Sequence, residues 1–225
     1  MDDTALTPGF WIERWQKGEI GFHQPEGNDL LVTHWPSLGA APGSTVFVPL
    51  CGKSRDMVWL ASQGHRVIGV ELSPLAVDDF FREQGIEADT NARGAFVVRS
   101  AGPISIWCGD VFELPAEVTR EVGAVYDRAA LVAFPHSLQV RYARRLMEII
   151  PAAAPMLLVS LAYPVGQIPG PPFSTPLMNV AELFAETYDI DVLESRDGLA
   201  ASPGLKARGV TSLEETAYVL RAKAG

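Results

Sequence analysis

The stretch VFVPLCGKSRDM, Val46 to Met57, joins an apolar run to a charged helix start through a single glycine. Continuous apolar residues are typical of a strand that is buried on both faces of a sheet. In open α/β sheets, ligands bind at the carboxyl ends of such strands, where the chain turns into the following helix. The stretch therefore predicts a strand–turn–helix unit with a binding site at its turn.

Apolar runs alternate with helical patterns along the rest of the chain. Short β-rich runs separated by longer helical patterns indicate βαβ units and a mostly parallel sheet. We expect strands at 45–50, 66–72, 104–108, 123–127, 155–163, 190–195 and 216–222, and helices at 54–63, 75–84, 136–150 and 180–187. The proline-rich stretch YPVGQIPGPPFSTP, Tyr163 to Pro176, interrupts this series and is expected to be an irregular functional cover.

The bulk composition predicts one α/β domain. The chain has 225 residues, of which 48% are hydrophobic and 20% charged, enough for a single sizeable core. We interpret residues 1–225 as one domain, in which 1–44 cover the ligands and 45–225 build the sheet. The net charge of -9 and the lack of any long basic run argue against a nucleic-acid partner.

Cysteine usage and hydropathy indicate the setting of the protein. Two cysteines, Cys51 and Cys108, are too few for a disulfide scaffold or a zinc site, so no metal is expected. No apolar run approaches the roughly 20 residues of a membrane span, and MDDTALTPGF lacks a signal-peptide pattern. We expect a cytoplasmic protein that acts on small molecules away from membranes, and a monomer.

Two phosphate-binding interpretations of the first turn fail on glycine spacing. A nucleoside-triphosphate loop needs a glycine five residues before Gly52, and Phe47 stands there instead. A dinucleotide fingerprint needs three glycines, of which only Gly52 is present. The backbone cradle that either phosphate group requires is therefore missing.

A nucleoside without phosphates agrees better with the residues at the strand ends. Glu71 closes the second strand about 20 residues after the glycine turn, where a carboxylate accepts hydrogen bonds from ribose hydroxyls. Asp110 ends the third strand and can accept from the adenine amine. A strand-end glutamate is also common as a helix cap, but the three features in order favour an adenosine site. S-adenosylmethionine is the common ligand of that kind.

Four segments carry a resemblance to a known family. They are FWIERWQKGEIGFHQ (10–24), FVPLCGKSRDMVWLASQGHRVIGVELS (47–73), YDRAALVA (126–133) and PGPPF (169–173). These motifs span most of the chain and resemble the thiopurine S-methyltransferases, in a form similar to the bacterial members.

The resemblance implies a fold and an activity. The fold is that of class I S-adenosylmethionine-dependent methyltransferases: a Rossmann-like α/β fold with a seven-stranded mixed sheet, an antiparallel last strand, helices on both faces and an N-terminal lid. The activity is methyl transfer to aromatic or heterocyclic thiols, which leaves S-adenosylhomocysteine, and bacterial relatives are linked to selenium and tellurium detoxification. A halide or thiocyanate methyltransferase, and a module that binds the cofactor without transfer, remain alternatives.

The resemblance also implies site residues. By position, cofactor contacts fall on Trp11, Leu50, Glu71 and Arg128, with Asp110 and Val111 beside the adenine. The full predicted cofactor set is Trp11, Trp15, Leu50, Gly52, Glu71, Leu72, Asp110, Val111 and Arg128.

The aromatic N-terminal segment is predicted to fold over the ligands. Trp11 and Trp15 are four residues apart, which places both indoles on one helical face. Core packing is the alternative, but the segment precedes the first strand and is not needed to complete the sheet. We hypothesise that Trp11 lies near the methionine end of the cofactor and Phe22 near the acceptor. Phe173 in the proline-rich stretch contacts substrate or packs within its loop.

Methyl transfer is an in-line displacement that depends on positioning and an ionised or lone-pair nucleophile, so no dedicated base is expected. Arg128 is the candidate catalytic residue, because a guanidinium can hold the acceptor anion or the cofactor carboxylate. A structural ion pair with Asp127 is the alternative. His23 and Cys51 are expected to be structural.

Overall fold

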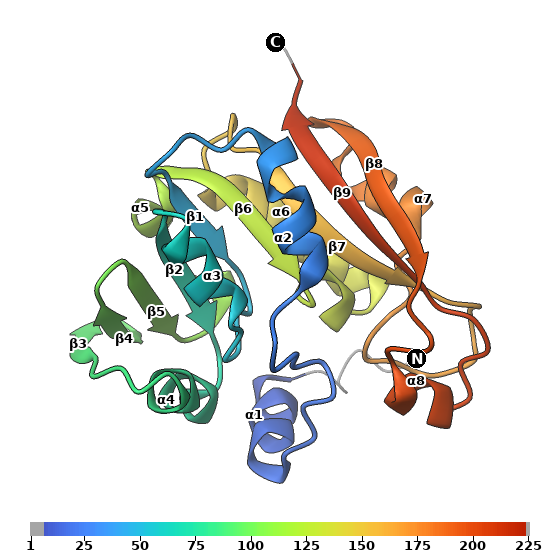
Figure 1. Ribbon diagram of the computed structural model, residues 1–225, viewed down its shortest axis with the longest axis horizontal. Coiled ribbons are helices and arrows are strands. Elements are labelled where there is room, and N and C mark those ends of the chain that lie inside the picture. The colour runs from blue at the N-terminus through green and yellow to red at the C-terminus, as the bar shows by residue number, and fades with distance from the viewer. Residues whose placement is uncertain (1–6, 224–225) are drawn as a thin grey trace.

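The computed structural model describes residues 7–223 and forms one mixed sheet between two layers of helices (Figure 1). The sheet contains nine strands in the order β3-β4-β5-β2-β1-β6-β7-β9-β8. Their bounds are β1 Thr45–Val48, β2 Arg66–Glu71, β3 Asp89–Arg93, β4 Phe96–Ala101, β5 Ile104–Cys108, β6 Val122–Arg128, β7 Met156–Ala162, β8 Tyr188–Asp197 and β9 Glu214–Ala222.

The central strands are parallel, as the alternation of apolar runs and helices predicts. β1 pairs with β2 and β6, β2 pairs with β5, and β6 pairs with β7, all in parallel. The last strand, β9, lies between β7 and β8 and runs antiparallel to both. The seven strands expected from the sequence therefore form the core of the sheet with the expected antiparallel last strand.

The expected strand number was wrong, because a hairpin extends the sheet from seven strands to nine. β3 pairs antiparallel with β4, and β4 pairs antiparallel with β5. Every residue of β3, with the sequence DTNAR, is exposed, so this edge strand lacks the apolar run by which the other strands are recognised. Its pairing with β4 holds it in the sheet without burial of its side chains.

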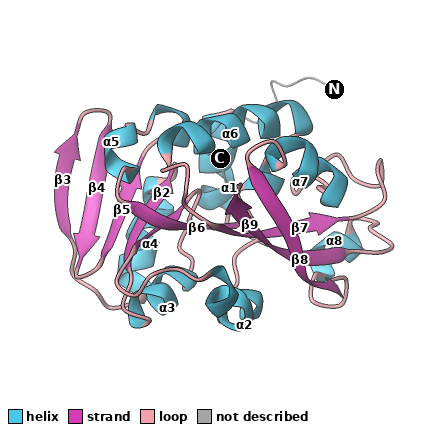
Figure 2. Ribbon diagram, turned by 90° about the horizontal axis from the view of Figure 1, so that it is seen from above, coloured by secondary structure: helices cyan, strands magenta, loops and turns pink. Residues whose placement is uncertain are grey.

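Helices cover both faces of the sheet (Figure 2). Their bounds are α1 Pro8–Lys17, α2 Asp29–Leu38, α3 Asp56–Ser62, α4 Pro74–Glu83, α5 Ala116–Thr119, α6 His136–Ile149, α7 Leu177–Phe184 and α8 Pro203–Ala207, with the 3₁₀ turns η2 Val111–Glu113 and η3 Leu131–Ala133. Helices α2, α3 and α4 pack on one face, and α5, α6 and α7 lie on the other. Helix α1 lies beyond the carboxyl ends of the strands (Figure 1).

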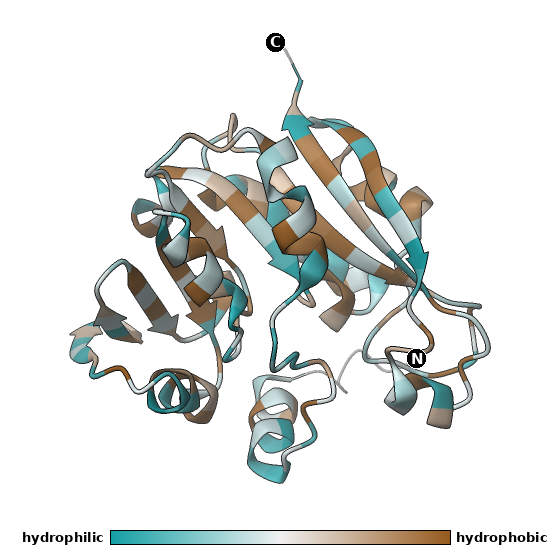
Figure 3. Ribbon diagram, in the orientation of Figure 1, coloured by the Kyte–Doolittle hydropathy of each residue, from teal (hydrophilic) through white to brown (hydrophobic). Residues whose placement is uncertain are grey.

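Each face of the sheet has its own hydrophobic core, which explains why the central strands are apolar throughout (Figure 3). On the first face, Leu31 of α2, Met57 of α3 and Phe80 of α4 pack against the strands and are fully buried. On the second face, Tyr142 of α6 and Phe184 of α7 are equally buried. Alternate residues of β1, β6 and β7 enter the two cores in turn.

Helix and strand boundaries differ from the expected ones by a few residues. The first strand stops at Val48 because Leu50 adopts a φ of 47°, a left-handed conformation that ends the strand. Helix α7 begins at Leu177, directly after Pro176, rather than at 180. Residues 163–176 contain no helix or strand, as their proline content predicts. In residues 7–223 no helix has the length and apolar character to cross a bilayer.

Candidate functional site

A cavity of about 750 Å³ opens at the carboxyl ends of the parallel strands. Segments from six parts of the chain line it: the N-terminal segment, the strand ends, η3, the start of α6, the proline-rich stretch and the region of α8. The lining includes Trp11, Arg14, Trp15, Phe22, Leu50, Glu71, Leu72, Asp110, Val111, Arg128, Ala129, Leu161, Pro171, Leu205, Arg208 and Glu215. Most of the predicted cofactor set therefore meets in one place.

The first turn is a strained backbone segment beneath the N-terminal helix. Leu50 lines the cavity with a φ of 47°, and Gly52 follows with a φ of 52°. A Cβ atom placed on Gly52 would lie 3.0 Å from the Trp15 ring, so only glycine lets the indole cover this turn. The side chain of Trp15, 6% exposed, thus acts as a packing element of the turn.

Glu71 is fixed at the end of β2 by two backbone donors. Its Oε2 accepts a hydrogen bond from the Gly52 N–H at 2.8 Å, and its Oε1 accepts one from the Ser73 N–H at 2.8 Å. Burial raises the pKa of the Glu71 carboxyl, while the backbone hydrogen bonds oppose that shift. Each carboxylate oxygen retains a second lone pair, which can accept from a ribose hydroxyl.

Asp110 organises the short turn that follows β5. Its Oδ1 accepts from the Phe112 N–H at 2.9 Å and caps η2. This turn places Val111, which is buried, and Phe112 along the cavity. The Arg141 guanidinium lies 4.2 Å from the centre of the Phe112 ring and closes that side. The Asp110 turn and Leu72 thus form a mainly apolar wall that has the carboxylates of Asp110 and Glu71 beside it. Such a wall suits an adenine ring.

The N-terminal segment closes the cavity with an aromatic cluster. Phe22 packs edge-on against Trp11 at 5.9 Å and against Trp15 at 5.7 Å between ring centres. The Trp11 Nε1 is buried and has no hydrogen-bond partner among residues 7–223. An indole N–H without a partner in a cavity wall is a donor that a bound molecule can use. The expected helical face with both indoles is present in α1.

Arg128 ties the N-terminal segment to the end of β6. Its Nη1 donates to the Phe22 carbonyl oxygen at 2.8 Å. Asp56 makes a second connection between the N-terminal segment and β6. Its Oδ1 accepts from the Asn28 N–H at 2.7 Å, and its Oδ2 accepts from the Tyr126 hydroxyl at 3.0 Å. Arg128 lines the cavity and remains a candidate for ligand contacts. No ion pair joins it to Asp127 within the described part of the chain.

Asp127 faces the opposite side of the sheet and supports the cavity floor from behind. It is fully buried, and its oxygens accept from the Tyr142 hydroxyl at 2.7 Å and the Leu131 N–H at 3.1 Å. The turn it supports contains Ala129, which has a φ of 63° and lines the cavity. Strained non-glycine residues at both Leu50 and Ala129 mark a site whose backbone is held in place by its surroundings.

The far wall joins the proline-rich stretch to the loop between β8 and β9. Arg208 donates to the Pro171 carbonyl oxygen at 2.7 Å. Pro171 and Pro172 line the cavity, whereas Phe173 is not among the lining residues and its ring lies against Gly170. The predicted contact between Phe173 and substrate stays a prediction, and the packing within its loop is what the structure contains.

Two residues expected to be structural differ in their placement, because His23 lines the cavity and Cys51 is buried in the core. Burial lowers the pKa of His23, which lies next to Phe22 at the cavity edge. Burial raises the pKa of the Cys51 thiol well above its ordinary value, so it stays protonated and packs in the core. Among residues 7–223 no cluster of His, Cys, Asp and Glu side chains is arranged to hold a metal ion.

Sequence reasoning missed much of the far wall. Leu161, Leu205, Arg208 and Glu215 all line the cavity and carry no recognisable motif. For one of them the sequence contains a signal: Glu215 stands in a strand whose other residues, from Thr216 to Leu220, are all buried. An acid in such a strand is a candidate for a cavity-facing position.

Comparison with known proteins agrees with this geometry. The family model described as thiopurine S-methyltransferase matches residues 6–223. The thiopurine S-methyltransferase of Methylococcus capsulatus is 49% identical over 220 residues, covering 97% of this chain and 99% of its own. Those of Pseudomonas entomophila and Xanthomonas axonopodis pv. citri are each 48% identical, covering 96% of this chain and 99% of their own.

Solved structures share the fold at low sequence identity. A SAM-dependent methyltransferase from Anabaena variabilis superposes with a TM-score of 0.64 at 17% identity, covering 96% of this chain and 95% of its own. The 1,6-didemethyltoxoflavin-N1-methyltransferase of Burkholderia thailandensis, solved with S-adenosylhomocysteine, gives 0.61 at 15% identity, covering 98% and 89%. The nine-stranded sheet is thus a class I methyltransferase fold with an added hairpin.

Proposed function

The chain belongs to the thiopurine S-methyltransferase family, and from that premise we propose that it methylates the sulfur of aromatic or heterocyclic thiols. Methyl transfer from S-adenosylmethionine is the activity of the family. The observation that carries the proposal is a single cavity that joins a nucleoside-type subsite at β2 and β5 to a mainly apolar subsite under the proline-rich stretch.

The residues at the strand ends suit S-adenosylmethionine. Glu71 would hold the ribose, and Leu72, Asp110 and Val111 would flank the adenine. Trp11 offers its unpartnered N–H from the lid side. Gly52 and Trp15 keep the first turn close to the cofactor, and Leu50 lines the wall above it. When bound, the cofactor supplies an activated methyl group on a positively charged sulfur.

The protein contributes position and electrostatics rather than a covalent step. The aromatic lid of Trp11, Trp15 and Phe22 excludes water from the transfer. Arg128 holds the lid through the Phe22 carbonyl and has further N–H groups that can stabilise an acceptor thiolate or the cofactor carboxylate. The remote parts of the acceptor would rest on Leu161, Pro171 and the start of α8, and Phe173 would act through the shape of its loop.

An assay with methyl-labelled cofactor and a panel of acceptors tests the proposal. We expect label on aryl and heterocyclic thiols, and we include a selenol and tellurite because selenium and tellurium detoxification is part of the expectation. A variant with Glu71 replaced by Ala serves as the control and should transfer no label. Tight binding of S-adenosylhomocysteine without transfer to any acceptor would indicate a binding module instead.

The alternative acceptor is a halide or thiocyanate ion. Iodide and an aryl thiol offered together to the enzyme separate the two, because each acceptor competes for the same methyl group. The volume of about 750 Å³ and the apolar residues Leu161, Pro171 and Leu205 of the far wall favour a ring-bearing acceptor over a small ion. Preferential methylation of iodide would contradict the thiol assignment. The predicted monomer is tested by light scattering on the purified chain, and the cytoplasmic location by cell fractionation.

A further inference from the structure

Glu215 is an acid in the cavity wall that no motif singles out. It lies in β9 between buried neighbours, and 8% of its surface is exposed. Its strand partner is Leu161 of β7, which also lines the cavity. Because paired residues point to the same face of a sheet, Glu215 stands beside Leu161 on the side that carries the cavity.

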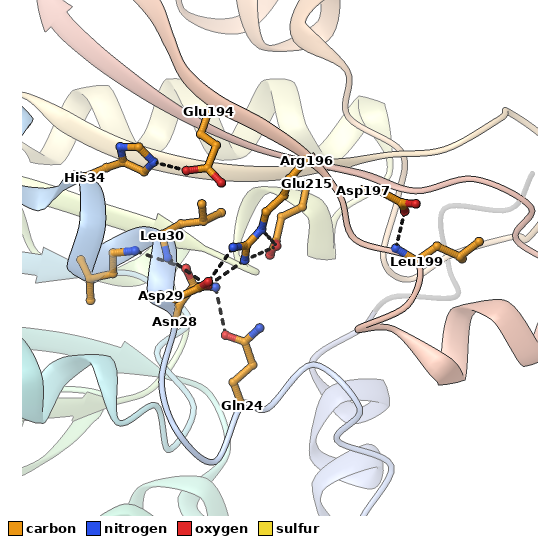
Figure 4. A network of polar contacts seen from close by, with 11 residues as sticks. Gln24, Asn28, Asp29, Leu30, His34, Glu194, Arg196, Asp197, Leu199 and Glu215 are labelled. Carbon is orange, nitrogen blue, oxygen red and sulfur yellow. Dashed lines mark hydrogen bonds and ion pairs between the residues drawn. The ribbon is translucent and has the colours of Figure 1, made fainter.

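One oxygen of this carboxylate is bonded to Arg196, which in turn contacts Asp29 (Figure 4). Neither Arg196 nor Asp29 lines the cavity. Glu215 Oε2 accepts from Arg196 Nε at 3.0 Å and Nη2 at 2.8 Å. Arg196 also donates to both oxygens of Asp29 at 2.6 and 2.7 Å. These contacts orient the Glu215 side chain and balance its charge.

The other oxygen of Glu215 has no partner in the described part of the chain. No hydrogen bond from residues 7–223 reaches Oε1, and this atom is not among the buried polar atoms that lack a partner. An oxygen that is neither bonded nor enclosed lies at an accessible surface, and Glu215 lines the cavity. The network thus presents one free, fixed hydrogen-bond acceptor to whatever the cavity holds.

The order of strands places Glu215 at the acceptor end. Along the sheet the cavity-lining positions run from Asp110 after β5, through Glu71 of β2 and Arg128 of β6, to Leu161 of β7 and Glu215 of β9. Adenine and ribose would occupy the β5 and β2 end. The methyl group would then lie near the middle, and the acceptor between Arg128 and Glu215.

We propose that Glu215 binds the ring N–H of a heterocyclic thione acceptor and takes up its proton during methyl transfer. The inference rests on the proposed function and deepens it, because it assigns a residue to the part of a heterocyclic acceptor in which an N–H is adjacent to the C=S carbon. The free Oε1 is the atom that touches the substrate. Arg196 and Asp29 are positioning residues for it.

An aryl thiol loses its proton to water before it attacks as a thiolate, whereas a thione keeps its N–H until the sulfur is alkylated, so its proton needs a base within the site. The thione sulfur attacks the methyl carbon and forms a new carbon–sulfur bond. The old methyl–sulfonium bond breaks, and its electron pair stays on the sulfur of S-adenosylhomocysteine. The ring nitrogen becomes acidic as the sulfur is alkylated, and its proton passes to the Glu215 carboxylate. The products are a neutral S-methyl heterocycle, S-adenosylhomocysteine and a protonated Glu215.

The test compares Glu215→Gln with the unaltered enzyme on two acceptors of equal ring size, pyridine-2-thione and thiophenol. The amide keeps the shape of the side chain and removes its charge and basicity. We expect kcat/KM for pyridine-2-thione to fall about 10- to 100-fold, the effect of losing a hydrogen bond to a charged group. Activity on thiophenol, which has no ring N–H, should stay within about twofold and also reports that the variant is folded.

Glu194→Gln is the matched control, because Glu194 lies in the neighbouring strand β8, pairs with His34 at 2.8 Å and is outside the cavity lining. It should change neither activity. Equal losses on both acceptors in Glu215→Gln, no loss on either, or the same selective loss in Glu194→Gln would each overturn the role of Glu215. If the unaltered enzyme binds S-adenosylhomocysteine but methylates neither acceptor, the proposed function itself fails.

Discussion

The Gly52 backbone N–H donates a hydrogen bond of 2.8 Å to Glu71 Oε2. This contact joins the turn after β1 to the end of β2, so the two halves of the nucleoside subsite are held in register before any ligand binds. Ser73 completes the arrangement by donating to the other oxygen. The carboxylate thus enters binding already oriented, and its remaining lone pairs are those available to a ribose.

Glu71→Gln should weaken the binding of S-adenosylhomocysteine by about 10- to 100-fold, measured by calorimetry. The amide NH₂ would face the N–H of Gly52 or Ser73, and the side chain would have to turn away from the ribose. Because burial raises the pKa of Glu71, affinity should also begin to fall, on acidification, at a higher pH than for an ordinary glutamate. Glu83→Gln, which affects only the surface pair with Lys53, should bind normally.

Gly52→Ala should destabilise the fold more than Gly18→Ala. Both glycines have a positive φ, 52° and 68°, so each alanine bears the left-handed penalty of about 1 kcal/mol. At Gly18 the added methyl group meets open space, whereas at Gly52 it meets the Trp15 ring at 3.0 Å. We expect a further loss of about 1–2 kcal/mol at Gly52 in urea unfolding. Equal losses of unfolding free energy in the two variants would show that the Trp15 side chain can move aside at no cost.

The sequence was sufficient to predict the core strands of the sheet and most strand-end residues of the candidate site. Apolar runs such as those of β1 and β7 are recognisable because both faces are buried. The exposed β3 and the short helix α8 are not, since neither has an apolar pattern that local spacing reveals. Glu71 and Asp110 were placed by their position after a strand, which is a local rule.

The residues of the far wall could not be predicted by a local sequence rule. Leu161 and Glu215 come together only through the antiparallel pairing of β7 with β9, more than fifty residues apart in the chain. The contact of Arg208 with Pro171 joins two loops in the same way. Acceptor subsites built from such long-range pairings cannot be predicted from the sequence alone, because residue spacing does not indicate which loops are in contact.

Trp11→Phe should weaken the binding of S-adenosylhomocysteine by about 3- to 10-fold, the effect of one lost N–H hydrogen bond. Trp11→Ala should weaken it further, because the lid also loses its packing on Phe22. Trp35→Phe is the control: its N–H donates to His65 at 3.0 Å, away from the cavity, so stability should fall while affinity is unchanged. Unaltered affinity in Trp11→Ala would remove Trp11 from the cofactor site.

Arg128→Lys should lower kcat/KM for an aryl thiol by about 10- to 100-fold. A lysine keeps the charge but cannot bond the Phe22 carbonyl and a ligand at once with a planar fork. Arg66→Lys serves as the control, because Arg66 is exposed and its nearest acid, Glu121, lies 3.9 Å away. We would measure steady-state kinetics for both variants. If Arg128→Lys has the same kcat/KM as the unaltered enzyme, Arg128 is excluded from the site.

Asp127→Asn should flatten the pH dependence of stability between about pH 4 and pH 6. Burial raises the pKa of Asp127 from 3.8 to about 6, against the hydrogen bonds from Tyr142 and Leu131 that favour the ionised form. In this window the folded protein retains a proton that the unfolded chain has released, so Asp127 makes the fold less stable as the pH rises. The shift of about two pH units corresponds to about 3 kcal/mol.

Urea unfolding at pH 4 and pH 7 measures this dependence in both proteins. Asparagine cannot ionise, so the variant should gain up to about 3 kcal/mol relative to the unaltered chain between the two pH values. That gain adds to a constant loss, because the amide can accept from only one of the two donors that Asp127 serves. Asp78→Asn, which affects an exposed pair with Arg99, controls for general charge effects. A pH-independent difference between Asp127→Asn and the unaltered chain would mean that this buried carboxyl titrates as it does in water, and that the cavity floor is open to solvent from behind.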